Sequence, residues 1–246
     1  MTNEGRMSLA AAFGALLLKL VTTRGFAAYV RPRMAPFLLA GGVTLLAGAV
    51  GSGWSSRRPS RSDAEAQAHA RGARLSFLLL GPIVLLAVMP PLPLGAAAAA
   101  MRGTGYRGPS VASFPSLPSP RRGAVDLTVS DFVGRALFDP DSSLRGVRLR
   151  LIGLVVAEPH GPPGGFELLR YAMFCCAADA IPLGVRIRGW TSGRVPAQDT
   201  WVEVIGTWRP AGPLASGRFD PSMMPTLDAD AVVAVPEPAD PYDPPF

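Results

Sequence analysis

Two adjacent cysteines, Cys175 and Cys176, are the residues of this chain whose types and spacing could do chemistry, and Asp179 follows them closely. They are the only cysteines among 246 residues. Thiolates bind soft and borderline metal ions, and a carboxylate can join them. Cys175, Cys176 and Asp179 are therefore candidate ligands for a transition-metal ion such as zinc or copper. No CxxC or HxxxH spacing accompanies them, so the sequence implies no definite cofactor.

The same pair also fits a structural role, a thiol-redox role or contact with a partner protein. Neighbours on a strand point to opposite faces, so if Cys176 faces inward with Phe174, Cys175 joins Met173 on the other face. A buried cysteine then packs as a small apolar residue. A disulfide between neighbours would distort the peptide, because bridged Cα atoms usually lie farther apart than adjacent ones. Asp179 is most simply a residue that caps a turn or helix after the strand.

No catalytic set accompanies the cysteines. The sequence has no glycine-rich phosphate loop and no nucleophile elbow, and it contains only two histidines, His69 and His160. Most hydrolase and transferase mechanisms would lack their base. We therefore expect a protein that is not an enzyme. Of the two histidines, His160 is the one that could approach the cysteines, across a neighbouring turn.

The residues around the pair predict an all-β domain over 125–236. Apolar and polar residues alternate at the start of the first strand-like run, as expected for a half-buried strand. The five runs cover 147–157, 166–176, 183–189, 200–208 and 230–235. Gly153 and Gly206 lie inside two of them, where glycine permits sharp bends. A small five-stranded OB-like barrel is the first expectation, and an irregular β-sandwich is the second.

Shorter features flank these strands. Thr128 or Ser130 can cap a short helix that ends near Leu137. The proline-rich tail, residues 237–246, is expected to lie extended.

The first 101 residues predict an α-helical membrane anchor. Three apolar segments, at 9–30, 34–54 and 75–95, have the length of about 20 residues that a bilayer core requires. Only the first contains charges, Lys19 and Arg24, and a signal peptide is its alternative interpretation. A linker rich in Gly, Pro and Ser follows at 102–124. We expect a multi-pass protein of the cell membrane, in contact with the lipid bilayer.

Charge is divided unequally between the two halves. Residues 1–125 contain 14 Lys or Arg against three acids, whereas residues 126–246 contain 10 against 15. Arginines are more numerous around the N-terminus and the second loop, which places the C-terminal domain outside the cytoplasm. OB barrels that bind single-stranded nucleic acid use basic grooves, and this domain is acidic. We therefore expect no nucleic-acid partner.

A longer motif surrounds the cysteine pair. The segment Arg170–Val185 contains Cys-Cys-Ala-Ala-Asp-Ala, and it resembles the YcgQ-like permease subunits, an uncharacterised family of membrane-anchored bacterial proteins with a CCAAD motif. The resemblance extends to three further stretches: 199–206, 225–233 and Pro241-Tyr242. It implies a membrane-anchored accessory subunit of a two-component permease, with a separate polytopic permease protein as partner and unknown cargo. It carries over Cys175, Cys176 and Asp179 without a role, and the alternative function is a free-standing, membrane-tethered protein that binds a metal ion through the cysteines.

Overall fold

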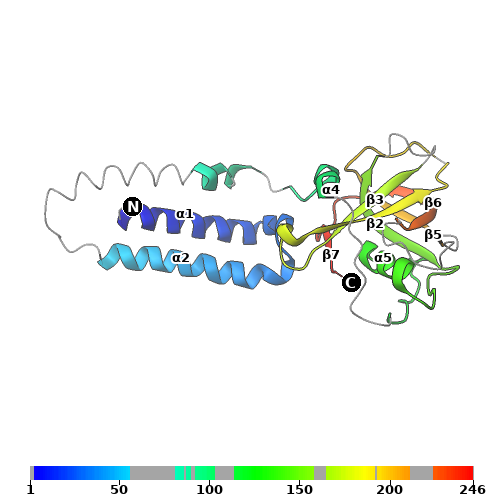
Figure 1. Cartoon of the computed structure of the whole chain (residues 1–246). Coiled ribbons are helices and arrows are strands. Elements are labelled where there is room, and N and C mark those ends of the chain that lie inside the picture. The colour runs from blue at the N-terminus through cyan, green and yellow to red at the C-terminus, as the bar shows by residue number, and fades with distance from the viewer. Residues whose placement is uncertain are drawn as a thin grey trace. The chain divides into compact units, whose positions relative to one another are not determined.

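A computed structural model of the protein shows two compact units, Met1–Pro93 and Leu94–Phe246. The structure describes residues 3–55, 81–85, 87–89, 92–102, 114–157, 165–191, 193–210 and 224–245. The first unit is helical in its described part, and the second is built on strands (Figure 1). His69 and His160 lie outside the described residues.

Two antiparallel helices, α1 (Asn3–Thr22) and α2 (Ala35–Ser55), lie in the described part of the first unit (Figure 1). Short 3-10 helices at Gly25–Ala28 and Pro32–Met34 connect them. The helices approach closely at Gly14, where an added Cβ would lie 2.9 Å from the carbonyl oxygen of Gly42. Small residues at a helix crossing allow such close backbone packing, which is common between membrane helices.

The helix bounds differ in part from the predicted ones. α1 ends at Thr22 rather than near residue 30, because Arg24 adopts a left-handed backbone (φ 58°) that a helix cannot continue through. α2 agrees with the predicted segment 34–54 to within about one residue. Of the third predicted segment, 81–85 and 87–88 are helical, and 75–80 lie outside the described residues. Lys19 donates a hydrogen bond to the carbonyl of Ala87 in this segment.

One helix in the described part of the chain is long and apolar enough to cross a membrane. It covers Pro32–Gly51, and only 11% of its span is buried in the protein. The core helix of a water-soluble protein would be mostly buried, so this helix presents an apolar surface to its surroundings. Met7–Thr22 is a shorter apolar helix.

Five strands of the second unit close into a barrel. They are β2 (Arg148–Val156), β3 (Phe166–Ala172), β4 (Ile181–Arg188), β5 (Trp201–Arg209) and β6 (Thr226–Ala234). Their spatial order is β2-β5-β6-β4-β3, and β3 pairs back with β2. All pairs are antiparallel except β4 with β6. The strand order and the single parallel pair are those of an OB barrel, which confirms the predicted fold class.

Glycines allow the sharpest bends of this barrel, as the sequence predicted. Gly153 lies where β2 leaves β5 and begins to pair with β3, and an added Cβ would be 2.8 Å from the carbonyl oxygen of Leu169. Gly206 lies at a register shift between β5 and β6, where a Cβ would collide with the carbonyl of Asp228. Both positions therefore require a residue without a side chain.

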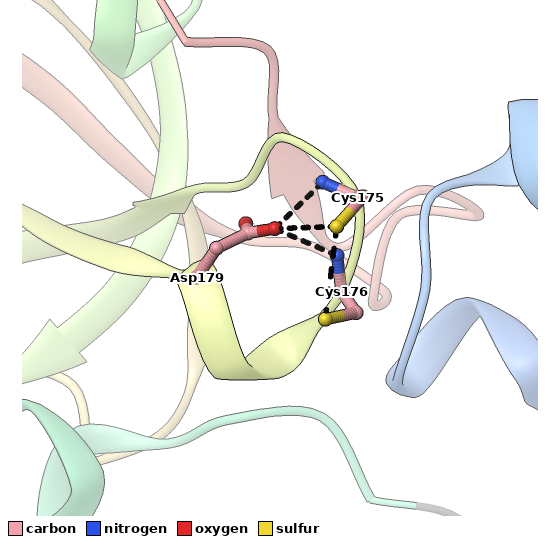
Figure 2. A group of neighbouring side chains, drawn as sticks. All are labelled: Cys175, Cys176 and Asp179. Atoms are coloured by element: carbon pink, nitrogen blue, oxygen red, sulfur yellow. Dashed lines mark hydrogen bonds between the residues drawn. The ribbon is translucent and has the colours of Figure 1, made fainter.

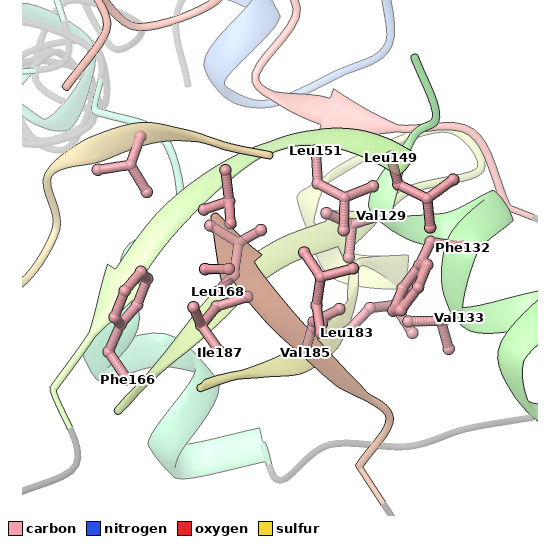
Figure 3. Close-up of a cluster of buried hydrophobic side chains, with 14 of the residues drawn as sticks. Val129, Phe132, Val133, Leu149, Leu151, Phe166, Leu168, Leu183, Val185 and Ile187 are labelled. Atoms are coloured by element: carbon pink, nitrogen blue, oxygen red, sulfur yellow. The ribbon is translucent and has the colours of Figure 1, made fainter. Parts of the chain in front are cut away.

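Helix α5 (Val129–Phe138) covers the apolar interior of the barrel. Thr128 caps it by accepting a 3.0 Å hydrogen bond from the Asp131 N–H, as predicted. Phe132 and Val133 are fully buried against Leu149, Leu183 and neighbouring strand residues (Figure 3). All residues of this core belong to the second unit, so the barrel has a hydrophobic interior of its own.

Two short parallel strands, which the sequence did not predict, extend the sheet. β1 (Val125–Asp126) pairs with β2, and β7 (Tyr242–Asp243) pairs with the end of β3. The proline-rich tail is thus extended and fixed to the barrel rather than free. At its end Asp243 is buried and forms a 3.1 Å ion pair with the buried Arg170.

Hydrogen bonds hold the first residues of the second unit against the barrel. Tyr171 donates a 2.8 Å hydrogen bond to the carbonyl of Gly95, and Leu94 donates its N–H to the hydroxyl of Tyr242. Asp199 accepts a 2.7 Å hydrogen bond from the Ala96 N–H, at the start of helix α4 (Ala96–Arg102). The boundary between the units therefore falls before the predicted end of the anchor at residue 101.

Candidate thiol and metal site

The cysteine pair lies in a short loop that follows β3. The strand ends at Ala172, and the N–H of Met173 donates to the carbonyl of Asp243, so the tail determines where the loop begins. Cys175 is exposed and Cys176 is half-buried. The predicted alternation is wrong here: Phe174 is 53% exposed and Met173 is fully buried, because the strand has ended before residue 174.

Asp179 organises this loop. It is the last residue of a single 3-10 turn, η3 (Ala177–Asp179), which turns its carboxylate back toward the preceding residues (Figure 2). One oxygen, Oδ1, accepts the N–H of Phe174 at 2.8 Å. The other, Oδ2, accepts the N–H groups of Cys175 and Cys176 at 2.9 and 3.1 Å. The expectation that Asp179 caps a turn after the strand is confirmed.

The thiol of Cys175 belongs to the same arrangement. Its Sγ–H donates to Oδ2 of Asp179 at 2.8 Å, and the Sγ of Cys176 lies 3.8 Å away (Figure 2). The structure therefore brings together the three residues that the sequence singled out. Their ligand atoms all lie within 4.8 Å of one another, and no second group of this kind occurs among the residues that the structure describes.

Electrostatics in the loop follow from these hydrogen bonds. The hydrogen bond to the Asp179 carboxylate, assisted by Cys176, raises the pKa of Cys175 to about 11. Partial burial raises the pKa of Asp179, but the hydrogen bonds from the Cys175 thiol and from three backbone N–H groups outweigh it and lower this pKa to about 2. At neutral pH the loop thus contains a protonated Cys175 thiol beside an ionised Asp179 carboxylate.

Sequence reasoning did not find a second group of polar residues near the start of this loop. Arg170 pairs with Asp243, donates to the carbonyl of Asp240 at 2.7 Å and stacks over the ring of Trp201 at 4.8 Å. Burial raises the pKa of Asp243, and the neighbouring Arg170 opposes this shift. A buried position for Arg170 could have been expected from its place in an otherwise apolar strand. Its partner Asp243 could not, because it lies 73 residues further along, in a tail without periodicity. These contacts of Arg170 bind the C-terminal tail to the barrel.

The barrel has a counterpart among known families. Residues 136–243 match the family model described as the DUF1980 C-terminal domain. DUF1980 is the YcgQ-like family. The barrel is therefore similar to the C-terminal domain of that family. The match includes Cys175, Cys176 and Asp179 and stops short of the first unit.

Comparison with other proteins adds little to this result. No curated protein matches the chain. Among solved structures, a chain described as an aspartyl-tRNA synthetase from Leishmania major Friedlin is similar at 14% sequence identity, with a TM-score of 0.27. The likeness covers 52% of this chain and 24% of the synthetase chain, and a TM-score at this level does not show a shared fold.

Proposed function

We propose that this chain is a non-enzymatic, membrane-anchored accessory subunit of a two-component permease. One observation carries the proposal: a barrel similar to the YcgQ-like C-terminal domain occurs in one chain with an apolar helix, Pro32–Gly51, that buries only 11% of its span. A helix that finds so little cover within its own unit is suited to lipid and to the helices of another membrane protein. The expected partner is a polytopic permease protein in the same bilayer.

The chemistry of the cysteine loop supports a role without catalysis. A carboxylate with a pKa of about 2 is a poor general base, and a thiol with a pKa of about 11 is a poor nucleophile at neutral pH.

The charge of the second half gives no support to nucleic-acid binding. Residues 126–246 contain 15 acids against 10 arginines, and a nucleic-acid-binding surface is basic.

The arginine distribution supports a barrel on the outer side of the cell membrane. A membrane-impermeant maleimide tests this placement on intact cells, because the only thiols of the chain are in the barrel. We expect labelling of intact cells before lysis, on long exposure to the reagent. Labelling only after lysis, with full labelling of the denatured protein, would place the barrel in the cytoplasm.

Co-purification tests the subunit assignment directly. The full chain is tagged at its C-terminus, isolated from its native membrane in a mild detergent and analysed by mass spectrometry. We expect one polytopic membrane protein in near-equal amount, absent from a control in which an unrelated membrane protein has the same tag. Recovery of the chain alone in several detergents would contradict the proposal. The geometry of the cysteine loop would then favour the second candidate, a free-standing, membrane-tethered protein that binds a metal ion.

A further inference from the structure

We propose that the thiolates of Cys175 and Cys176 and the carboxylate of Asp179 form a zinc site with one open coordination position. This site goes beyond the subunit function and does not depend on it. The proposal rests on the spacing of the ligand atoms, the mixture of ligand types and the way in which the loop is fixed.

The spacing of the two sulfurs fits a tetrahedral zinc ion. Two thiolates at the usual Zn–S distance of about 2.3 Å are about 3.8 Å apart when the S–Zn–S angle is tetrahedral. The Sγ atoms of Cys175 and Cys176 are 3.8 Å apart, which is also too far for a disulfide bond. The two sulfurs therefore already lie close to the separation that the ion requires, before any side-chain adjustment.

The edge between the Asp179 carboxylate and the Cys175 sulfur must lengthen, and all the ligand atoms lie within 4.8 Å of one another. Oδ2 of Asp179 lies 2.8 Å from Sγ of Cys175, whereas the corresponding edge of a zinc tetrahedron is about 3.6 Å. Because Cys175 is exposed, its side chain can rotate outward by this amount. Zn²⁺ then replaces the proton between sulfur and oxygen, and the two thiols release their two protons to solvent. The third ligand stays in place because Oδ1 retains its hydrogen bond from the N–H of Phe174.

The mixture of ligands favours zinc over other ions. Soft Cu(I) prefers sulfur ligands alone, whereas Mg²⁺ and Ca²⁺ prefer oxygen, and zinc accepts two thiolates together with a carboxylate. Two thiolates and one carboxylate give three negative charges, which the ion largely neutralises. The carboxylate also accepts three backbone N–H groups, so it is oriented before the ion arrives.

The fourth coordination position is open. Among the residues that the structure describes, no other His, Cys, Asp or Glu joins this group, and Cys175 is exposed to solvent. Water or an incoming ligand therefore completes the tetrahedron, as in zinc sites that exchange ligands rather than those that only stabilise a fold. An exposed three-ligand site can take up and release its ion without unfolding of the barrel.

Zinc titration of the full-length protein tests the proposal. The protein is reduced, kept in detergent and prepared without a histidine tag, and Zn²⁺ binding is measured in competition with a chromophoric chelator. We expect one ion per chain, and at least about tenfold weaker binding in each of Cys175→Ser and Cys176→Ser, since changes even beyond the ligands cost about 10–100-fold in affinity. Asp230→Asn is the matched control, because Asp230 is an exposed acid on β6 outside the site, and it should bind as the unchanged protein does.

Cobalt supplies a second measurement that depends on the sulfurs alone. Co²⁺ in place of zinc should give a thiolate-to-metal charge-transfer band that weakens in each single serine variant and disappears in the double variant. Tryptophan fluorescence should show that these variants remain folded. Equal zinc binding by the unchanged protein and the double variant, or a cobalt complex without this band, would overturn the proposal. Neither outcome affects co-purification with a permease, so the two proposals fail separately.

Discussion

At the residue scale, Asp179 forms a hydrogen bond with the thiol of its neighbour Cys175. Its carboxylate accepts the Cys175 Sγ–H at 2.8 Å and raises the pKa of that thiol to about 11. An exposed thiol would ordinarily react quickly with alkylating reagents, but a protonated one does not. We therefore expect that Cys175, measured in a Cys176→Ser background at pH 7.5, reacts with iodoacetamide about tenfold or more slowly than a thiol with the usual pKa of about 8.5.

Asp179→Asn supplies the comparison for this rate. The amide is neutral and cannot stabilise the protonated thiol in the same way, so the reaction should become faster and its midpoint should shift to lower pH. The reaction of the denatured protein gives the reference rate. Equal rates in the Asp179→Asn variant and its parent would show that the hydrogen bond does not control the thiol.

The same carboxylate makes the stability of the loop depend on acid. The pKa of Asp179 is about 2 in the folded protein, below its ordinary value of 3.8. The ionised form is therefore favoured by folding, so its contribution is complete above about pH 4 and is lost as the pH falls from 3.8 toward 2. Since the group is partly solvated, we expect Asp179→Asn to lower the free energy of unfolding by about 1 kcal/mol at pH 7.

Denaturant unfolding followed by tryptophan fluorescence measures this difference, because three of the four tryptophans belong to the second unit. The difference between the variant and the unchanged protein should shrink as the pH approaches 2. A difference that is independent of pH would mean that the amide variant acts through packing rather than through charge.

At the element scale, the sequence predicted the strands that have a regular alternation of apolar and polar residues. It did not predict the features that depend on contacts between residues far apart in the chain. The five barrel strands were found because alternation and glycine position are local signals. The predicted facing was wrong at Met173 and Phe174, because β3 ends at Ala172, although Cys175 is exposed and Cys176 is partly buried as expected. β1 and β7 were missed because two residues have no period. The sequence suggested that Asp179 could lie near the cysteines, but which atoms meet depends on the torsions of a single turn.

The bends of the barrel lead to a prediction about Gly153. An added methyl group would lie 2.8 Å from the carbonyl oxygen of Leu169 and 2.9 Å from the side chain of Leu168, both fully buried residues of β3. One of the two strands must move, which opens the pairing that closes the barrel. We expect Gly153→Ala to lower the free energy of unfolding by about 2–3 kcal/mol, as overpacked cores do.

Denaturant unfolding, again followed by tryptophan fluorescence, checks this value. Gly51→Ala in α2 is the matched control, because an added Cβ there has nothing within 4 Å. The control should be unchanged or slightly more stable. A barrel that tolerates Gly153→Ala equally well would show that β2 and β3 can separate at this point without cost.

At the scale of the whole molecule, the chain joins a helical unit to a barrel with a core of its own. The junction follows Pro93, and the first residues of the second unit are held by side chains from three segments that are far apart in the sequence. Tyr171 binds the carbonyl of Gly95, Tyr242 binds the N–H of Leu94, and Asp199 binds the N–H of Ala96. These contacts fix the point at which the chain enters the barrel, close to the start of the cysteine loop.

Removal of the two tyrosine hydroxyls tests whether these contacts hold the junction. Tyr171→Phe with Tyr242→Phe keeps both rings, whose centroids lie 6.4 Å apart, and removes only two hydrogen bonds. Each bond contributes about 1 kcal/mol, so the barrel should lose about 2 kcal/mol at most, while residues 92–102 open more often. Hydrogen exchange should therefore become about tenfold or more faster in this segment, and little faster in β5. Tyr29→Phe, in the first unit, is the control and should leave the exchange of residues 92–102 unchanged. An unchanged exchange rate in the double variant would mean that the apolar packing of Leu94, Ala98 and Ala99 against the barrel holds the junction without the hydroxyls.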